Sequence, residues 1–511
     1  MPIEHKNSQL PGKKTIGLLL GPILAVIILF FDLQPGSPAV TRCAAAAIWM
    51  AVWWLTEAVP IPATALLPIV LFPMLGILSG KATAGQYFNS VIFLFVGGFI
   101  IALAMQRWGL HKRIALKIIL LIGISRRRIV LGFMAATFFL SMWISNTATT
   151  MMIVPMAMAI IIKMKESFDE KIVNRFAIGL LIGIAYAASI GGTATLIGTP
   201  PNLAFSRILE ITFPNAPEIS FARWMLFGLP FAVIFLFVAW YILTRLYASR
   251  KEKLNADVGL FREEYKKLGP MSFEEKAVLA LFCLAAFLWL FRKSLTIGGF
   301  TIPGWSDIFP SPGFIDDGTV AIFIGMLLFI IPARMRVDGQ RTRLIDWQTA
   351  IRLNWGIVIL FGGGFALAAG FEQSGLAAYL GNQLSGLHGM SPLLIVIITC
   401  TLLTFLTELT SNTATTQIFL PILASLAVAI GINPLLLMIP ATLSASCAFM
   451  LPVATPPNAI VFGTGEVQIQ DMMKTGIIMN IIGVFLITAL IYLLGLHVFG
   501  IDLSSVPAWA L

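Results

Sequence analysis

Charged residues are scarce in this chain of 511 residues: 11% are Asp, Glu, Lys or Arg, whereas 58% are hydrophobic. The mean hydropathy of +0.91 lies far from that of soluble globular domains. The deficit of charge therefore excludes a soluble fold. Apolar runs of about 17 to 25 residues, the length that crosses a bilayer as helix, recur from end to end, and the alternating pattern of an outer-membrane barrel is lacking. We expect an all-α polytopic membrane protein.

Cysteine and histidine are also rare, with four residues of each. Each cysteine stands singly in an apolar segment without CxxC spacing, which favours packing over metal ligation. The histidines lie in loops or near the chain ends, so no histidine metal cluster is expected. Catalytic motifs such as HExxH and GxSxG do not occur in the sequence, and this disfavours an enzyme.

The formal net charge of +10 does not indicate a nucleic-acid partner, because Lys and Arg gather in short loops between apolar runs, as the positive-inside rule describes. The basic loops are 126–128, 163–175, 245–276 and 334–343, whereas 294–317 and 376–391 are not basic. This distribution predicts eleven transmembrane helices in the inner (plasma) membrane. The N-terminus is expected in the cytoplasm and the C-terminus outside.

The polar hexapeptide SNTATT interrupts two long apolar segments, beginning at Ser145 and again at Ser411. The first segment, 129–162, has basic flanks, and each of its arms is about 16 residues, which spans only about 24 Å as helix. We therefore expect a re-entrant hairpin that enters from the cytoplasm and turns at the hexapeptide. The second segment, 392–430, has uncharged flanks, so its hairpin should enter from outside.

The hexapeptides are part of a longer internal repeat. FVGGF from Phe95 matches FGGGF from Phe361, and SNTATT matches SNTATT, at one constant offset of 266. GTPPN from Gly198 recurs as ATPPN from Ala454 at a slightly shorter spacing. Because equivalent loops are basic in one half and uncharged in the other, we predict an inverted-topology repeat. Such repeats are typical of secondary transporters with alternating access, and they disfavour a channel.

The repeated motifs combine small polar side chains with interruptions of the helix. A helix that starts just after Ser145 or Ser411 would point its free N–H groups and positive dipole end at an anion. The Pro-Pro pairs that follow Thr199 and Thr455 should break their helices and free carbonyl oxygens, which hard cations such as Na⁺ prefer. Neither hairpin segment contains Lys or Arg. A carboxylate substrate would therefore be neutralised by helix ends and bound cations, which couples anion uptake to cation uptake.

Two carboxylates, Glu57 and Glu408, lie in apolar surroundings near expected helix breaks. A proton relay is one interpretation of such residues. The favoured alternative is a buried hydrogen bond from each carboxylate to the backbone. Gly97, Gly98, Gly363 and Gly364 are interpreted as close helix contacts rather than ligands.

The paired hexapeptides, the paired TPPN breaks and the stretch WWLTEAVPIPATALLP from Trp53 closely resemble the divalent anion:sodium symporter family of dicarboxylate, citrate and sulfate carriers. The similarity covers nearly the whole chain. It implies a homodimer of eleven-helix protomers with two re-entrant hairpins, in which a transport domain moves by an elevator mechanism against a scaffold. The implied segments are the first scaffold helices (1–128), the first hairpin and broken helix (129–224), scaffold helices of both repeats with a cytoplasmic linker at 249–275 (225–391), the second hairpin and broken helix (392–475) and a last helix (476–511).

The resemblance also implies two sodium sites and one substrate site. One sodium site would use Ser141, Ser145, Asn146 and backbone near Gly198, and the other would use Thr407, Thr410, Asn412 and backbone near Ala454. At Thr410 the family is expected to contribute backbone only. Substrate carboxylates would meet Asn146, Thr147 and Thr199 on one side, and Asn412, Thr413, Thr455 and Pro456 on the other. The expected function is sodium-coupled import of succinate, malate or fumarate; a sodium-independent exchanger of the same fold and a citrate or sulfate carrier are the alternatives.

Overall fold

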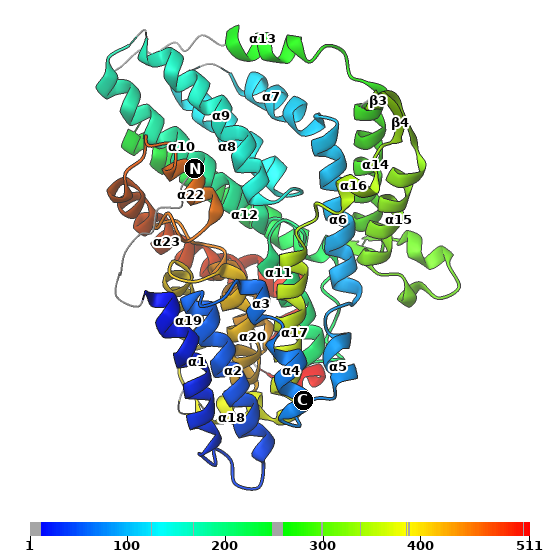
Figure 1. Cartoon of the computed structure of the whole chain (residues 1–511), viewed down its shortest axis with the longest axis vertical. Coiled ribbons are helices and arrows are strands. Elements are labelled where there is room, and N and C mark those ends of the chain that lie inside the picture. Colours follow the sequence, from blue (N-terminus) through cyan, green and yellow to red (C-terminus); the bar gives the residue numbers. More distant parts are fainter. Residues whose placement is uncertain are drawn as a thin grey trace, which may run out of the picture.

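The computed structural model describes residues 12–123, 125–166, 168–247, 259–297, 300–337, 339–384, 386, 389–503 and 505–511. Helices form most of the regular structure in these ranges (Figure 1). Two short antiparallel hairpins, which the sequence did not predict, join helices: β1 (Leu295–Ile297) pairs with β2 (Phe300–Ile302), and β3 (Pro332–Val337) pairs with β4 (Gln340–Arg343). The predicted helical class is confirmed.

Eight helices in the described ranges are long and apolar enough to cross a membrane. They are Pro38–Thr56, Gly80–Arg107, Asn146–Lys165, Glu170–Thr193, Phe221–Tyr247, Trp355–Ser374, Asn412–Ala429 and Ile469–Phe499. Further apolar helices are shorter, among them Lys14–Leu29, Asp317–Ile330, Pro392–Thr407 and Leu435–Ala445. The chain is a multi-pass membrane protein, and the number of eleven crossings stays a prediction.

The first half of the chain forms twelve helices in the described ranges. Their bounds are α1 (Lys13–Leu29), α2 (Pro38–Thr56), α3 (Ile61–Thr64), α4 (Leu67–Met74), α5 (Gly80–Gly85), α6 (Ser90–Arg107), α7 (Leu110–Ile122), α8 (Arg126–Ser141), α9 (Asn146–Lys165), α10 (Glu170–Thr193), α11 (Pro200–Thr212) and α12 (Phe221–Tyr247). The apolar stretch 61–78 is divided into α3 and α4, because Pro68 lies in the first turn of a new helix that follows a turn.

In the second half, the order of elements repeats much of the first. The bounds are α13 (Gly259–Lys267), α14 (Phe273–Leu290), η1 (Trp305–Ile308), η2 (Pro312–Phe314), α15 (Asp317–Ile330), α16 (Trp347–Ala350), α17 (Trp355–Ser374), α18 (Leu376–Gln383), α19 (Pro392–Thr407), α20 (Asn412–Ala429), α21 (Leu435–Ala445), α22 (Pro456–Phe462), α23 (Ile469–Leu490), η4 (Ile491–Gly495), α24 (Leu496–Phe499) and η5 (Ala508–Ala510). Part of the linker at 249–275 lies outside the described residues.

Two helices lie at equivalent places where the sequence predicted loops. α7 follows Gly109 (φ 71°) and α18 follows Gly375 (φ 78°). Both glycines adopt the left-handed conformation, which other residues rarely adopt, so the chain can turn sharply between two helices. α7 then packs on α8, and α18 packs on α20.

Both hexapeptides lie where one helix ends and the next begins. α8 ends at Ser141 and α9 begins at Asn146; α19 ends at Thr407 and α20 begins at Asn412. The two arms of each pair pack on each other. In Figure 1, α8 and α9 lie in the upper half of the molecule and α19 and α20 in the lower half.

The TPPN motifs break helices at the predicted places. α10 ends at Thr193 and α11 begins at Pro200, while α21 ends at Ala445 and α22 begins at Pro456. Each new helix carries proline in its first turn, where the missing N–H has no intrahelical partner to lose. The two halves then interlock, since α11 packs along α20 and α22 packs along α9.

The paired glycines pack tightly against neighbouring elements, as predicted. A Cβ on Gly97 would lie 2.5 Å from the backbone of Ala321, and one on Gly363 would lie 2.3 Å from the carbonyl oxygen of Ala65. A Cβ on Gly364 would lie 2.0 Å from the Gln417 side chain. These glycines allow α6 and α17 to approach their partners closely.

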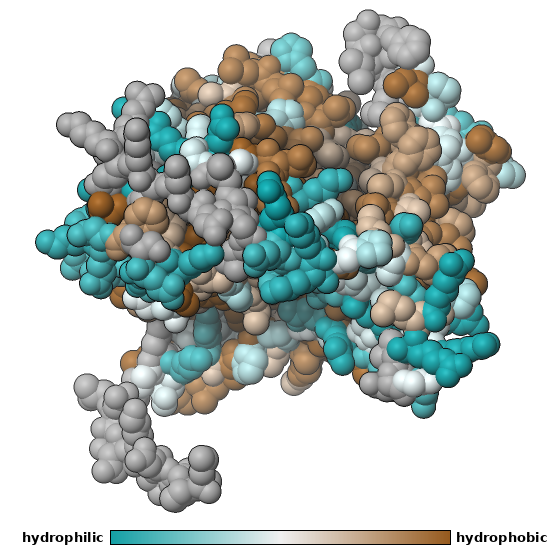
Figure 2. Space-filling model, turned by 90° about the horizontal axis from the view of Figure 1, so that it is seen from above, coloured by the Kyte–Doolittle hydropathy of each residue, from teal (hydrophilic) through white to brown (hydrophobic). Residues whose placement is uncertain are grey.

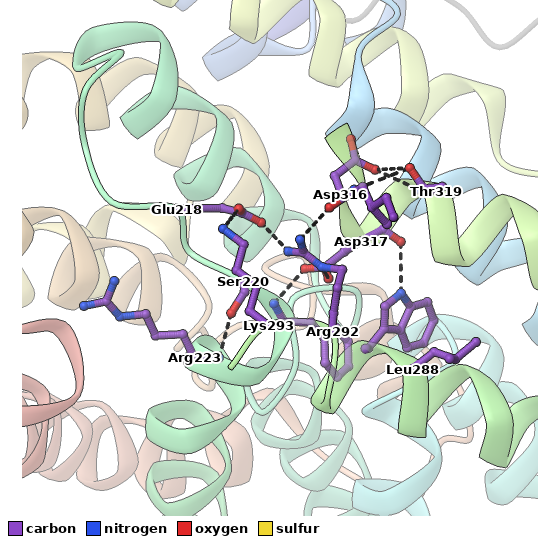
Figure 3. A network of polar contacts seen from close by, with 12 residues as sticks. Glu218, Ser220, Arg223, Leu288, Arg292, Lys293, Asp316, Asp317 and Thr319 are labelled. Atoms are coloured by element: carbon purple, nitrogen blue, oxygen red, sulfur yellow. Dashed lines mark hydrogen bonds and ion pairs between the residues drawn. The ribbon is translucent and has the colours of Figure 1, made fainter. Parts of the chain in front are cut away.

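A buried ion-pair network joins the ends of α12, α14 and α15 (Figure 3). Arg292, whose side chain is 1% exposed, donates from Nε to Asp317 Oδ1 (2.6 Å), and it also pairs with Glu218. Asp317 Oδ2 accepts a hydrogen bond of 2.8 Å from the backbone N–H of Phe221, the first residue of α12. The guanidinium therefore connects three segments that are distant in sequence.

Replacing Arg292 with Met should lower the free energy of unfolding by about 3–5 kcal/mol, because removing one partner leaves a buried carboxylate uncompensated. Denaturant unfolding of the detergent-solubilised protein measures this loss. The control is Lys293→Met, because Lys293 is 48% exposed where it pairs with Glu218 and its loss should cost less than about 1 kcal/mol. Equal effects of the two substitutions would contradict a special role for the buried pair.

Candidate substrate and cation site

The two hexapeptides place equivalent hydrogen bonds at the start of α9 and of α20. Ser141 Oγ donates to Asn146 Oδ1 (2.5 Å), and Thr407 Oγ1 donates to Asn412 Oδ1 (2.7 Å). A hydroxyl at the end of one arm thus orients the amide at the start of the next arm in both halves. The predicted pairs Ser141 with Asn146 and Thr407 with Asn412 are brought together by the structure.

The helix starts are only partly covered. Ser145, Asn146, Thr147, Ser411 and Asn412 are half-buried, and Ser145 Oγ caps α9 by accepting the N–H of Ala148 at 3.3 Å. The N–H groups of the first turn point out of each helix, and the helix dipole adds partial positive charge there. These two helix ends are suited to an anionic group.

Gly192, at the end of α10, marks where predicted ligands of the first sodium site converge. A Cβ on Gly192 would lie 2.8 Å from Asn146 Oδ1 and 3.0 Å from the Gly198 carbonyl oxygen. These two oxygens therefore face one point beside Gly192, and both belong to the ligand set that the family resemblance implies. The glycine itself was missed, because a glycine within a run of small apolar residues gives no signal of its own.

The asparagine of each TPPN motif holds the broken segment in place. Asn202 Nδ2 donates to the carbonyl oxygens of Gly192 (3.2 Å) and Thr195 (2.7 Å). Asn458 Nδ2 donates to those of Ala448 (3.1 Å) and Leu451 (3.0 Å). The acceptors occupy corresponding positions of the repeat. In each half, one lies ten residues and the other seven residues before the asparagine. The asparagine therefore positions the backbone of the break from within the fold.

In the second break, a buried carboxylate holds the backbone between α21 and α22, and the first break has no carboxylate at the corresponding position. Glu408 Oε1 accepts the backbone N–H groups of Phe449 (2.7 Å) and Met450 (2.9 Å), and Oε2 accepts that of Leu451 (3.0 Å). Asn480 Nδ2 adds a fourth hydrogen bond, of 2.7 Å, to Oε1. Glu408 is 3% exposed. The predicted buried hydrogen bond to backbone is confirmed for Glu408.

In the first break, neutral groups have the corresponding role. Thr195 Oγ1 donates to the Met142 carbonyl oxygen (2.6 Å) and accepts the Gly198 N–H (3.1 Å). Met142 occupies the position in the first repeat that Glu408 occupies in the second. The two breaks therefore have similar paths but different electrostatic surroundings.

Glu57 differs from the prediction. Its side chain is 60% exposed and lies 3.8 Å from Lys14 Nζ, so a buried hydrogen bond to backbone is wrong for this residue. Glu57 instead ends α2 in the left-handed conformation, with φ 49°. The prolines that follow it start a new helix and explain why the chain turns there.

The remaining predicted site residues lie in or just before the first turns of α11, α20 and α22. Thr199 and Thr455 directly precede α11 and α22 and are 4% and 5% exposed, and Thr413 is 7% exposed. Pro456 is exposed and Ala454 is buried. Thr410 Oγ1 lies 2.6 Å from Thr415 Oγ1 and 3.0 Å from the Leu406 carbonyl oxygen. Its hydroxyl is engaged within the hairpin.

The donors around both motifs are hydroxyl, amide and carbonyl oxygens. Among the residues that the structure describes, no group of three or more His, Cys, Asp or Glu side chains could hold a metal ion. Neutral oxygens suit a hard monovalent cation, whereas transition metals favour nitrogen and sulfur ligands.

Interlocked helical hairpins, paired helix breaks and neutral oxygens at the breaks define the class of a polytopic membrane transporter. The family model described as the sodium:sulfate symporter transmembrane region matches residues 13–501, and the chain belongs to this family. This confirms the resemblance that the motifs indicated.

Relatives of known name support a transporter rather than an enzyme. The chain is 46% identical over 508 residues to a sodium-dependent dicarboxylate transporter, SdcS, of Staphylococcus saprophyticus, covering 98% of this chain and 95% of the relative. It is 46% identical over 512 residues to the SdcS protein of Staphylococcus aureus, with the same coverage. The chain is accordingly a transporter.

Two solved structures share the fold at low sequence identity. The YdaH transporter of Alcanivorax borkumensis aligns with a TM-score of 0.52 at 14% identity, covering 90% of this chain and 98% of that one. MtrF of Neisseria gonorrhoeae aligns with a TM-score of 0.56 at 15% identity, covering 96% and 97%.

Proposed function

We propose that this protein imports C4 dicarboxylates such as succinate, malate or fumarate together with sodium ions. The observation that carries the proposal is the duplicated pair of hydroxyl and asparagine at the two helix starts, Ser141 with Asn146 and Thr407 with Asn412. The relatives named sodium-dependent dicarboxylate transporters support the choice of substrate and of ion.

We assign two or more sodium ions to each protomer. The first ion would bind Ser141, Ser145, Asn146 and the Gly198 carbonyl, whose approach to Asn146 beside Gly192 supports this set. The second would bind Thr407, Asn412 and the carbonyls of Thr410 and Ala454. The engaged hydroxyl of Thr410 supports a contribution from its backbone only. Two monovalent cations would balance the charge of a dianion.

The substrate carboxylates would bind at the helix starts. One carboxylate would meet Asn146, Thr147 and Thr199, and the other would meet Asn412, Thr413, Thr455 and Pro456. Because the segments 129–162 and 392–430 contain no Lys or Arg, the dianion would meet only partial charges at the helix starts without sodium. Sodium binding would therefore precede tight substrate binding, and this is a physical reason for coupling.

An elevator mechanism fits the packing of the helices. The moving body would comprise α8 to α12 and α19 to α23, since α12 packs on α8, α10 and α23, and α10 packs on α22. The scaffold would comprise α1 to α6 and α14 to α17, where α6 packs on α14 and α15, and α17 packs on α2, α3 and α4. This division moves α12 out of the scaffold segment 225–391 that the family resemblance suggested.

A glycine lies at the surface between the two proposed bodies in each repeat, although its neighbour differs. A Cβ on Gly98 would lie 3.4 Å from Ile197 in the first break, and one on Gly364 would lie 2.0 Å from Gln417 in α20. Gly98 and Gly364 correspond in the repeat. We propose that these glycines of α6 and α17 let the moving body approach the scaffold closely and slide past it. We also propose that the scaffold forms the contact between the two protomers of a homodimer.

We place the protein in the plasma membrane with its N-terminus in the cytoplasm and its C-terminus outside. The positive-inside rule supports this orientation. Basic α13 and the β3–β4 hairpin lie toward one end of the molecule, and uncharged α18 lies toward the other (Figure 1).

Uptake of labelled succinate by purified protein in proteoliposomes tests the proposal. An inward sodium gradient should drive accumulation above equilibrium, whereas potassium, proton or lithium gradients imposed alone should drive much less. Uptake that needs an internal dicarboxylate and ignores sodium would instead identify an exchanger. Stronger competition by citrate or sulfate than by malate and fumarate would overturn the substrate assignment.

A further inference from the structure

The β3–β4 hairpin lies where an apolar helix ends. It directly follows α15, whose Phe323, Met326 and Ile330 are 53%, 53% and 58% exposed. Trp347, just after the hairpin, is 67% exposed. Exposed apolar residues on a helix of a membrane protein face lipid, and Trp is enriched at the membrane surface. The hairpin therefore lies at the level of the lipid headgroups.

Two arginines face each other across this hairpin. Arg336 of β3 pairs in register with Arg341 of β4, and both residues are exposed. Side chains directly opposite on an antiparallel pair begin about 5 Å apart, and like charges at such positions destabilise the pair. A bound anion would remove this repulsion.

The other two arginines of the hairpin have contacts within the fold. The Arg334 guanidinium lies 4.2 Å from the centre of the Phe273 ring, and Arg343 Nη1 donates to the Ile330 carbonyl oxygen at 2.7 Å. The hairpin backbone is held as well, because Glu274 Oε1 accepts the N–H groups of Arg334 (2.7 Å) and Met335 (2.8 Å). The strand pair is thus anchored to α14 and α15.

Arg336 and Arg341 differ from these neighbours. Neither forms an ion pair with a carboxylate among the residues that the structure describes. Asp338, which comes between the two strands in the sequence, lies outside those residues. The anchored backbone holds Arg336 and Arg341 opposite each other, so both side chains leave the same face of the hairpin, and both residues are exposed.

We propose that Arg336 and Arg341 together bind the headgroup phosphate of an anionic phospholipid in the cytoplasmic leaflet. The planar guanidinium matches a phosphate with two parallel hydrogen bonds, so two opposed arginines can hold one phosphodiester. A zwitterionic lipid also presents a phosphate, but its ammonium group would be repelled by the second arginine. The preference is therefore for an anionic headgroup such as phosphatidylglycerol.

The surroundings of the pair fit this ligand. The acyl chains would lie along the exposed apolar side of α15, and Trp347 would lie at headgroup level beside them. Seen from the end that carries α13 and the hairpin, hydrophilic residues form a broad area with apolar residues on the flanks (Figure 2). The inference depends on the cytoplasmic position proposed for this end and not on the substrate or the ion.

Photo-crosslinking in proteoliposomes tests the site directly. The full chain would be reconstituted with photoreactive phosphatidylglycerol or with photoreactive phosphatidylcholine of the same acyl chains, and labelled peptides covering 332–347 would be counted by mass spectrometry. We expect phosphatidylglycerol labelling of this region to fall about thirtyfold in the double variant Arg336→Gln/Arg341→Gln, as removal of two interfacial charges implies. Phosphatidylcholine labelling should be weak and unchanged.

The matched control removes two charges from α13 at the same end of the molecule. Arg262 and Lys266 are both exposed, and Arg262→Gln/Lys266→Gln should leave labelling of 332–347 as in the wild type. An equal loss in both double variants would show general attraction to an anionic surface and overturn the site. Undiminished labelling in Arg336→Gln/Arg341→Gln would leave the arginines as a topology signal only. Unfolding temperatures and succinate uptake of both variants show whether they are folded.

Discussion

Replacing Asn146 or Asn412 with Ala is expected to reduce sodium-driven succinate uptake to about 1% of the wild-type rate. Each asparagine would contribute to a sodium ion and to a substrate carboxylate, and each charge-assisted hydrogen bond of this kind contributes roughly 1.5–3 kcal/mol. The loss of two such contacts corresponds to a reduction of about 100-fold or more. Initial rates in proteoliposomes with an inward sodium gradient measure the effect.

The control for these two variants is an asparagine outside the proposed site. Asn382, exposed in α18, should tolerate alanine with near-normal uptake. Monodisperse elution in detergent and a normal unfolding temperature would show that Asn146→Ala and Asn412→Ala are folded. Wild-type rates in either variant would refute the site assignment.

The two helix starts that carry Asn146 and Asn412 could be predicted from sequence because the signal is duplicated. One polar hexapeptide in an apolar segment has several explanations, but the second copy, together with TPPN at a similar distance, indicates a shared geometry. The structure brings together Ser141 with Asn146, Thr407 with Asn412, and Asn146 with Gly198 as expected. Helix ends and breaks were predictable for the same reason, because proline and small polar residues act locally.

Other features depend on contacts that leave no local signal. α7 and α18 follow left-handed glycines, and with 13 and 8 residues they are too short to be recognised as membrane spans. The buried Arg292 joins Glu218 and Asp317 from other segments, and nothing near Arg292 in sequence indicates these partners. Asn202 and Asn458 were predicted to lie at breaks, but the carbonyl groups that they bind could be identified only from the folded path of the chain.

Glu408 illustrates the limit of a single sequence most clearly. A carboxylate in an apolar segment is compatible with a proton relay or with a structural hydrogen bond. The structure surrounds both oxygens with donors, three from the backbone of the second break and one from Asn480. Tyr186 also donates to the Phe449 carbonyl oxygen at 2.8 Å. Hydrogen bonds therefore fix both backbone N–H groups and a backbone carbonyl group of the second break.

Replacing Glu408 with Gln should lower succinate uptake at least about tenfold and weaken the dependence on sodium. A carboxylate has only acceptors, whereas the amide of Gln places an NH₂ group against at least one of the backbone donors. A buried donor left without an acceptor costs about 1–3 kcal/mol. The segment that leads to Ala454 and Thr455 would shift, and the second sodium site would lose affinity. Uptake measured against sodium concentration should show a higher half-saturating value.

A control variant and a pH profile distinguish two roles of Glu408: structural support of the second break and proton transfer. Glu372 lies exposed in α17, and Glu372→Gln should leave the sodium dependence unchanged. Structural support predicts that Glu408→Gln impairs uptake at every pH from 5.5 to 8.5 and raises the sodium requirement throughout. A relay predicts instead that the variant transports normally with sodium but no longer responds to a proton gradient. That result would remove Glu408 from the framework of the sodium site and assign it to proton coupling.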